Sequence, residues 1–274
     1  MNKNFMNRLT MLAVTLMASM ACFAQGKSAT TIGAGHVAGD IFDYQELRYY
    51  VISNSGILEL EVIGLASQIS GSTGDKTLLT SEFENKVTIP LYVSGTVAGQ
   101  SFFVSSIAAN AFTSTSCRGD AADNKANFAD AAALVTSITI DYNEEYDAAT
   151  IGANAFAGLT ALTEVNNLTP GTAIAAIPDN AFATAVYKKP LIVPEERMGK
   201  YSQVGGWKNF RLIKDQEGHI LGNMNTDTRL TTGDYSSLLL LVKSKPTSFP
   251  SYADVNGDGR LSTADCSALL LLIK

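Results

Sequence analysis

The sequence is poor in the side chains that build zinc sites and disulfide frameworks. Its 274 residues include 3 cysteines, 2 histidines and 1 tryptophan. His36, His219 and the distant Cys117 and Cys266 do not supply a tetrahedral zinc site of the usual composition. The two cysteines also lie too far apart in the sequence to suggest a disulfide framework.

The sequence also lacks basic charge and catalytic motifs. Its 20 Lys and Arg residues stand against 26 Asp and Glu residues, so no basic stripe is expected and nucleic acid is not an expected partner. No nucleophile elbow, phosphate loop or Cys–His pair occurs, and the glycine-rich residues 33–39 follow no predicted strand. We therefore expect a non-catalytic protein, with a glycoside-active carboxylate pair as the alternative that leaves no motif.

The one long apolar run lies in residues 1–24. Lys3 and Arg8 precede the run LTMLAVTLMASMACFA, and Ala24 ends a small-residue cleavage site before Gln25. This pattern is typical of a secretory signal peptide, and the run is too short for a comfortable membrane span.

Cleavage there would make the protein exported and more acidic. It removes two basic residues and no acidic one, which changes the formal net charge from −6 to −8. No other stretch is expected to cross a bilayer, so we expect a secreted or cell-surface protein. The rival interpretation is a lipidated Cys22, although the preceding residues SMA lack the leucine of a lipoprotein signal.

One hexapeptide, Ile-x-x-Asn-Ala-Phe, occurs three times in the middle of the chain. The copies lie at residues 107–112, 151–156 and 177–182, with spacings of 44 and 26 residues. Such recurrence is typical of a solenoid, in which each unit stacks on the next. We expect the Ile and Phe of each copy to be core residues and the Asn to bridge backbone groups of a turn.

Strand patterns flank these repeats. Leu58, Leu60 and Val62 alternate with glutamates after an NSG turn, which predicts a β-hairpin within residues 44–64. That hairpin would cover the open edge of the first repeat. The segment with Trp207 would cap the other end; its indole is expected in the core, with stacking on a sugar as the alternative.

The run IGANAFAGLTALTEV resembles the BspA-like leucine-rich repeats of bacterial surface proteins. The segment LIVPEERMGKYSQVGGWKNF is similar to the stretch that closes such arrays, and VTIPLYVSGTVAGQSFFVSSIAANAF to their entry. The resemblance implies an α+β protein, with a linker and N-terminal β cap over residues 25–85 and a short leucine-rich-repeat β-solenoid over residues 86–215. Such a solenoid would offer a surface to a protein or a glycan.

The end of the chain is a second, tandem repeat. Shifted by 31 residues, residues 223–243 align with residues 254–274, and 12 of the 21 positions are identical. Each copy sets acidic and amide residues at fixed spacing and then continues into four leucines. A solvated acidic turn would not be expected to recur together with the helix that follows it.

The second copy begins with the spacing of an EF-hand-type calcium loop, residues 254–265, here called loop 2. Such loops bind Ca2+ through oxygens at positions 1, 3, 5, 7, 9 and 12, with glycine at position 6. Gly259 occupies position 6, and the clustered carboxylates would repel one another without a cation. The expected ligands are Asp254, Asn256, Asp258, the Arg260 carbonyl, Ser262 (directly or through water) and Asp265.

The first copy, residues 223–234 or loop 1, departs from this pattern at two positions. Asn223 replaces the first carboxylate, and Thr228 stands where glycine is expected. We expect a lower affinity for Ca2+, with a loop that keeps its shape but stays empty as the alternative. The expected ligands are Asn223, Asn225, Asp227, the Arg229 carbonyl, Thr231 and Asp234.

Two such loop–helix units resemble a type I dockerin, over residues 219–274, here called the tail. The resemblance implies a small all-α calcium-binding domain that docks to a cohesin domain of a larger extracellular assembly. The family's Ser-Thr pair is absent, so no known cohesin specificity is implied. The positions that face the partner in that family match Thr232, Gly233, Leu239, Leu240, Thr263, Ala264, Leu270 and Leu271.

The leucine runs indicate association independently of the resemblance. Four consecutive leucines advance about 300° around a helix, so packing two such helices together leaves apolar surface on each. That surface would meet either the repeat region or another protein. We expect a secreted binding protein with a docking tail. The alternatives are an adhesin whose calcium-stabilised tail is purely structural, and an accessory component of a polysaccharide-degrading assembly.

Overall fold

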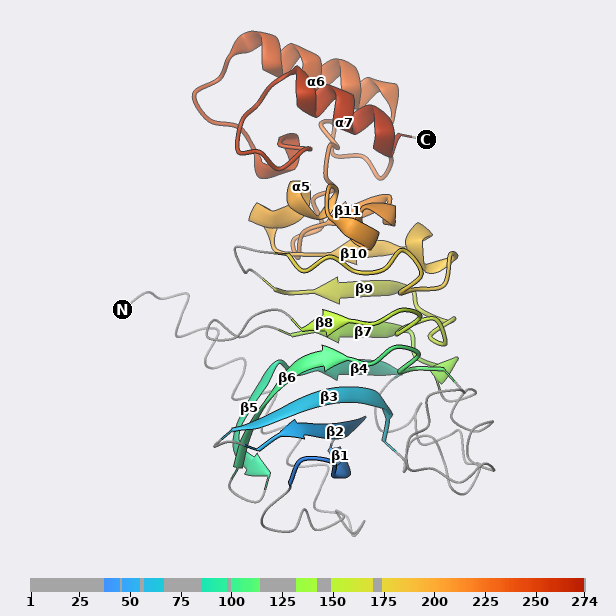
Figure 1. The fold of residues 1–274 in the computed structure, drawn as a ribbon. Helices are drawn as coiled ribbons and strands as arrows, with labels where there is room; N and C mark the ends of the chain where they lie inside the picture. Colours follow the sequence, from blue (N-terminus) through green and yellow to red (C-terminus); the bar gives the residue numbers. More distant parts are fainter. Residues whose placement is uncertain are drawn as a thin grey trace. The chain divides into compact units, whose positions relative to one another are not determined.

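A computed structural model of the chain describes eight ranges of residues (Figure 1). All of them belong to one compact unit, His36–Lys274. The signal peptide, the Cys22 lipidation site and Cys117 lie outside the described residues, so the predictions about them stay predictions. Within the described part, no helix is both long and apolar enough to cross a bilayer. The described residues are 37–44, 46–54, 57–66, 85–97, 100–113, 132–141, 149–169 and 174–273.

The first sheet begins with the predicted hairpin. β2 (Leu47–Ser53) and β3 (Leu58–Leu65) pair antiparallel, and the leucines of β3 are buried while its glutamates are half-buried, as the alternation predicted. β3 then pairs in parallel with β6 (Gln100–Ile107), the strand that leads into the first hexapeptide. β1 (Ile41–Tyr44) and β5 (Tyr92–Val97) complete the order β1-β2-β3-β6-β5, and the short β8 (Thr150–Ile151) pairs with β6.

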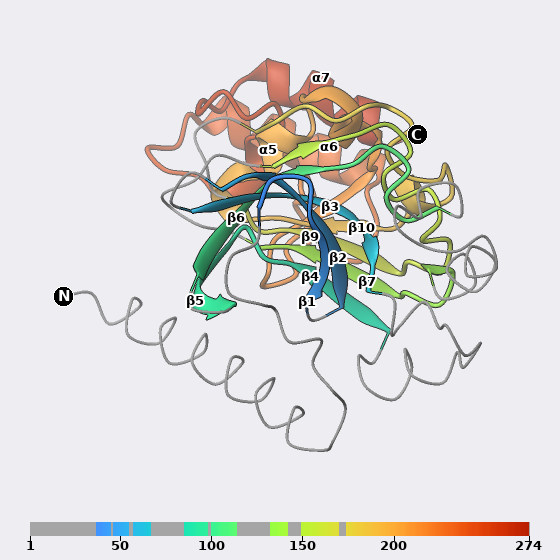
Figure 2. The ribbon, with the colours of Figure 1, turned by 60° about the horizontal axis from the view of Figure 1, so that its bottom comes forward.

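The second sheet is parallel throughout, and its strands follow the order of the sequence. It runs β4-β7-β9-β10-β11, and Figures 1 and 2 show successive strands lying beside one another. Parallel neighbours require the chain to cross over and return between strands, as stacked repeats do. The assignment to the leucine-rich-repeat class stays a prediction. The strands are β4 (Lys86–Ile89), β7 (Ser137–Ile140), β9 (Glu164–Asn167), β10 (Pro190–Ile192) and β11 (Leu212–Lys214).

The three hexapeptides stack through their phenylalanines. Phe112 lies 5.6 Å from Phe156, and Phe156 lies 4.7 Å from Phe182, between ring centroids. All three rings are stacked and buried, because each copy places its Phe at the same point of the unit. Ile107, Ile151 and Ile177 are buried as well, so the predicted core role of these residues is confirmed.

The asparagines of the first two hexapeptides have a left-handed backbone conformation. Asn110 and Asn154 have φ of 58° and 56°, in the left-handed region that asparagine tolerates better than most residues. The N–H of Asn110 donates to the carbonyl of Ala153 on the next copy at 2.9 Å. Neither asparagine makes a side-chain hydrogen bond to another described residue, which differs from the expected side-chain bridge.

The repeats end in residues 194–211, here called the closing segment. It contains η2 (Glu195–Arg197), α5 (Met198–Tyr201) and η3 (Gly205–Asn209), and it follows η1 (Val186–Lys188) and β10. Trp207 in η3 is buried, and its indole N–H donates to the Ala175 carbonyl at 3.0 Å. Trp207 is therefore a core residue and not a platform for a sugar.

The tail contains two α-helices, each preceded by one of the loops. α6 (Thr232–Ser244) follows loop 1 and α7 (Thr263–Leu272) follows loop 2, as the duplicated sequence predicted. The short η4 (Ser251–Ala253) leads into loop 2. The two helices contact each other (Figure 1), and Leu238 and Leu269 are buried within the tail.

Candidate metal centre

Loop 2 is folded by hydrogen bonds from its own backbone to the expected ligands. Asp254 accepts the N–H groups of Asp258 and Gly259 at 3.1 and 2.8 Å. Asn256 accepts the Asp258 N–H at 3.0 Å, and Asp258 accepts the Arg260 N–H at 2.8 Å. An oxygen that accepts one hydrogen bond keeps a lone pair. These turns therefore position the expected ligand oxygens and leave each of them able to bind a cation.

The last expected ligand of each loop is a buried carboxylate at the start of a helix. Asp234 and Asp265 are fully buried, and each forms a capping box with the hydroxyl residue three positions earlier. Asp265 accepts the N–H of Ser262 at 2.8 Å and that of Asn256 at 3.2 Å, which joins the helix to the front of the loop. These caps were not among the sequence predictions, although a Ser or Thr three residues before an acid signals one.

The loop carboxylates make no ion pair within the described part of the chain. Burial raises the pKa of Asp254, hydrogen bonds from the N–H groups of Gly259 and Asp258 oppose that, and the negative charges of Asp265 and Asp258 raise it further. A cation would stabilise the ionised form that burial and these neighbours disfavour. The carboxylates without an ion-pair partner there are Asp227, Asp234, Asp254, Asp258 and Asp265.

Loop 1 repeats the central turns and leaves one buried oxygen unsatisfied. Asn225 accepts the Asp227 N–H at 3.0 Å, and Asp227 accepts the Arg229 N–H at 2.7 Å, as in loop 2. Asn223 is 5% exposed; its amide donates to the Asp227 carbonyl, and its Oδ1 has no hydrogen-bond partner in the part of the chain that the structure describes. A buried acceptor left unpaired costs about 1–3 kcal/mol, and a cation at position 1 would satisfy it.

The backbones of the two loops differ at the positions that need left-handed conformations. Loop 2 has Gly257 and Gly259 at φ of 70° and 80°. Loop 1 has Thr226 at φ 60°, whereas Thr228 is not among the left-handed residues. Loop 1 thus has a left-handed residue at one position, whereas loop 2 has two. Its left-handed residue is also more strained, because threonine is β-branched and disfavours this conformation. This difference agrees with the lower affinity expected for loop 1.

The donors of loop 2 are all oxygens, which suits a hard cation such as Ca2+. Among the described residues, no group of three or more His, Cys, Asp or Glu side chains lies close enough to hold a metal by itself. Loop 2 would therefore also need the amide of Asn256, the hydroxyl of Ser262 and the carbonyl of Arg260. These are the donors that the spacing predicted, so the residues fit the ion chemically.

Most residues predicted to face a partner are exposed. Thr232, Gly233, Thr263 and Ala264 are exposed at the starts of the helices, and Leu239 is half-buried. The exposed leucines are Leu240, Leu270 and Leu271, at 68%, 46% and 67%. The alternative in which the leucine runs pack on the repeat region is wrong for these three side chains.

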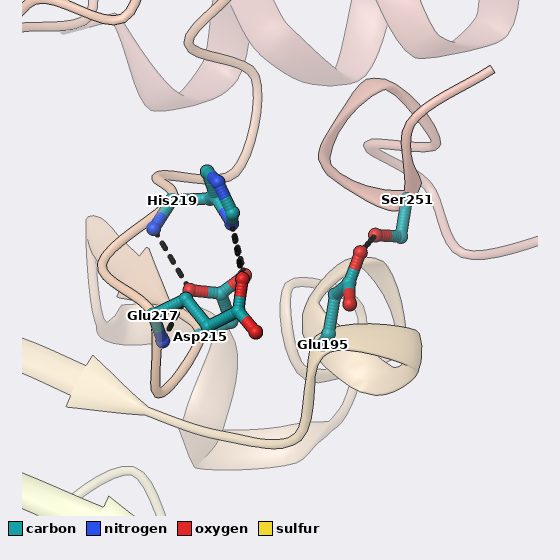
Figure 3. Close-up of polar contacts among 5 residues, drawn as sticks. All are labelled: Glu195, Asp215, Glu217, His219 and Ser251. Carbon is teal, nitrogen blue, oxygen red and sulfur yellow. Dashed lines mark hydrogen bonds and ion pairs between the residues drawn. The ribbon is translucent and has the colours of Figure 1, made fainter.

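A polar cluster joins the end of β11 to the start of the tail (Figure 3). The carboxylate of Asp215, 3% exposed, accepts the N–H groups of Glu217 and His219 and lies 2.6 Å from His219 Nδ1. Beside it, the Ser251 hydroxyl donates to the carboxylate of Glu195 in the closing segment. Nothing in the sequence predicted this cluster, because its members are separated by up to 56 residues.

His219 predicts a pH-dependent stability. The hydrogen bond and charge of Asp215 raise the pKa of His219 above its ordinary value of 6.5, burial opposes this slightly, and Glu217 and Glu195 add to the increase. The stability contributed by the protonated form is thus present below pH 6.5 and is lost as the pH rises through the folded-state pKa. Thermal unfolding measured from pH 6 to 9 should show this loss in the wild-type chain and not in His219→Gln; equal pH profiles would contradict it.

Comparisons of the chain with protein-family models, with curated proteins and with solved structures found no match. The resemblances to BspA-like repeats and to dockerins therefore depend on the motif residues alone. The geometry above bears on calcium binding and docking without those family names.

Proposed function

We propose that this is a secreted, non-catalytic binding protein whose calcium-dependent, dockerin-like tail docks to a cohesin-type partner. Its repeat region would present a surface to a protein or a glycan. The observation that carries the proposal is the duplication: two loop–helix units place matching oxygen donors in their loops and matching exposed faces on their helices.

Calcium would supply a positive charge in contact with the loop carboxylates, which make no ion pair to another described residue. The chain's own residues do the rest: the loop turns hold Asp254, Asn256 and Asp258 around the front of loop 2, and Asp265 holds that front against α7. The Asp265 carboxylate both caps α7 and accepts a hydrogen bond from the front of loop 2. A calcium ion bound to this carboxylate would therefore link ion binding to the stability of α7.

The docking surface is supported by the helical geometry. Residues seven apart on an α-helix lie about 20° apart around its axis, so Gly233 and Leu240 share one face of α6. Ala264 and Leu271 share the equivalent face of α7, and all four are exposed. Small residues beside large exposed leucines are what a helix-packing interface needs, since they let a partner approach the backbone.

The test is binding of the mature chain to a panel of immobilised type I cohesin domains. We expect calcium-dependent binding that Leu240→Asp with Leu271→Asp weakens by roughly 30-fold or more, as loss of central interface residues does. Thr247→Asp with Ser248→Asp, at exposed positions between the helices, is the matched control and should bind normally. Binding to no cohesin, or equal binding in EDTA, would reject docking.

A second candidate is a cell-surface adhesin whose tail is a calcium-stabilised structural cap. The observation that favours it is direct contact between the tail and the closing segment, through Ser202 and the backbone of Val255. A chain that binds calcium and no cohesin, and whose repeat region is less stable in EDTA, would favour this candidate.

A further inference from the structure

Loop 2 packs backbone to backbone against α5 in the closing segment. A Cβ added to Gly199 would lie 2.2 Å from the Asp254 carbonyl oxygen and 2.6 Å from the Gly257 nitrogen. A Cβ on Gly257 would lie 2.5 Å from the Lys200 nitrogen. Because real Cβ contacts are not this short, only glycine at both positions permits this approach.

Further contacts hold the segment that leads into loop 2. The Ser202 hydroxyl bonds to the Val255 carbonyl at 2.8 Å, and Ser251 bonds to Glu195 in η2. His219 stacks on Tyr252, with ring centroids 5.5 Å apart and planes at 27°. Ser202 and Glu195 of the closing segment thus contact the start of loop 2 and the segment before it across 53 and 56 positions of sequence.

Among the described residues, loop 1 makes no hydrogen bond to the closing segment. Positions 3 and 4 of loop 1, Asn225 and Thr226, are exposed, whereas the matching Asn256 and Gly257 of loop 2 are half-buried. Position 4 of loop 1 is Thr226, whose side chain would not permit the approach that Gly257 makes. The two loops therefore share a sequence pattern and differ in what holds them.

We propose that the closing segment is a docking site for loop 2, and that Gly199 and Ser202 are positioning residues for its cation. Asp254 and Asn256, expected ligands at positions 1 and 3, are carried by the backbone that touches α5. Calcium binding to loop 2 and order in the closing segment are then coupled, and linkage makes the coupling reciprocal. This inference rests on calcium binding by the tail, as in the proposed function.

The direct test is calcium calorimetry on the mature chain and on Gly199→Ala. Gly199 is not a ligand and lies 55 residues before Asp254, yet we expect its substitution to weaken the tighter site by about tenfold, within the usual 5- to 150-fold range of such couplings. Gly152→Ala is the matched control, because its Cβ would press on the Ala109 backbone at 2.4 Å inside the repeats. It should leave the calcium affinity unchanged.

A milder variant keeps the test valid if Gly199→Ala does not fold. Ser202→Ala adds no atom and removes the hydroxyl that lies 2.7 Å from the Gly199 carbonyl and 2.8 Å from the Val255 carbonyl. It should weaken calcium binding by a smaller factor, about threefold, as the loss of one shared hydrogen bond does. If both variants fold and bind calcium with wild-type affinity, the proposal is wrong. If only Ser202→Ala folds and it binds calcium with wild-type affinity, the proposal is also wrong.

The reciprocal effect has its own reporter. Trp207 is the only tryptophan and meets Tyr201 of α5 edge-on, with centroids 5.6 Å apart. Its fluorescence should report an unfolding midpoint that rises with calcium in the wild type and rises less in Ser202→Ala. If calorimetry detects calcium binding but this midpoint does not move, the coupling is wrong and the proposed function stands. If calorimetry detects no calcium binding by the wild type, both fail.

Discussion

Asp254→Asn is expected to weaken the tighter calcium site of the mature chain by at least about tenfold, equivalent to about 1.4 kcal/mol. The substitution removes one of three carboxylates from loop 2 and gives position 1 the residue that loop 1 has naturally, Asn223. The two oxygens of Asp254 each accept one N–H group, and asparagine replaces one of these oxygens with an NH2 group that cannot accept. The loss of charge and the altered turn are therefore both expected to lower the calcium affinity.

Isothermal calorimetry of calcium binding measures this effect. Glu217→Gln is the control, because it removes a carboxylate that is 77% exposed and outside both loops. Far-UV circular dichroism with and without EDTA should show that α6 and α7, of 13 and 10 residues, lose helicity when calcium is removed. An unchanged affinity in Asp254→Asn, or a spectrum that EDTA does not alter, would contradict calcium binding at loop 2.

Phe156→Ala is expected to lower the free energy of unfolding of the repeat region by about 3–5 kcal/mol. Phe156 is the middle ring of the stack, fully buried between Phe112 and Phe182. Its loss leaves a cavity that the neighbouring rings cannot fill, because parallel strands and inter-copy hydrogen bonds on both sides hold the copies at a set spacing.

Denaturant unfolding followed by Trp207 fluorescence provides the measurement. Leu240→Ala removes an exposed apolar side chain and should change stability by less than about 0.5 kcal/mol. A Phe156→Ala chain that unfolds within 1 kcal/mol or so of the wild type, below the range for buried aromatic residues, would show that the phenylalanines do not form one shared core.

These two predictions concern regions that the sequence describes through local patterns. The alternation of leucine and glutamate in β3 could be predicted because successive side chains of a strand point to opposite faces. The helices of the tail could be predicted because each loop and the helix that follows it form one continuous segment. The hexapeptide core followed from recurrence alone.

Other features depend on segments that are far apart in the sequence. Four leucines in a row do not reveal that Leu238 is buried and Leu240 exposed, because that depends on where the neighbouring helix lies. The pairing of His219 with Asp215 requires the turn after β11 to bring a buried carboxylate within hydrogen-bonding distance of the imidazole Nδ1. The left-handed Thr226 is a further case, since position 6 was the expected site of strain in loop 1.

By itself, the sequence predicted the hairpin of β2 and β3, the buried residues of the hexapeptides and the helix that follows each loop. Each of these follows from side-chain spacing along a continuous segment. The tertiary structure alone decided that loop 2 lies on α5 and loop 1 does not. That difference arises because Gly199 and Gly257, 58 positions apart, both lack the Cβ atoms that would keep the two backbones separate.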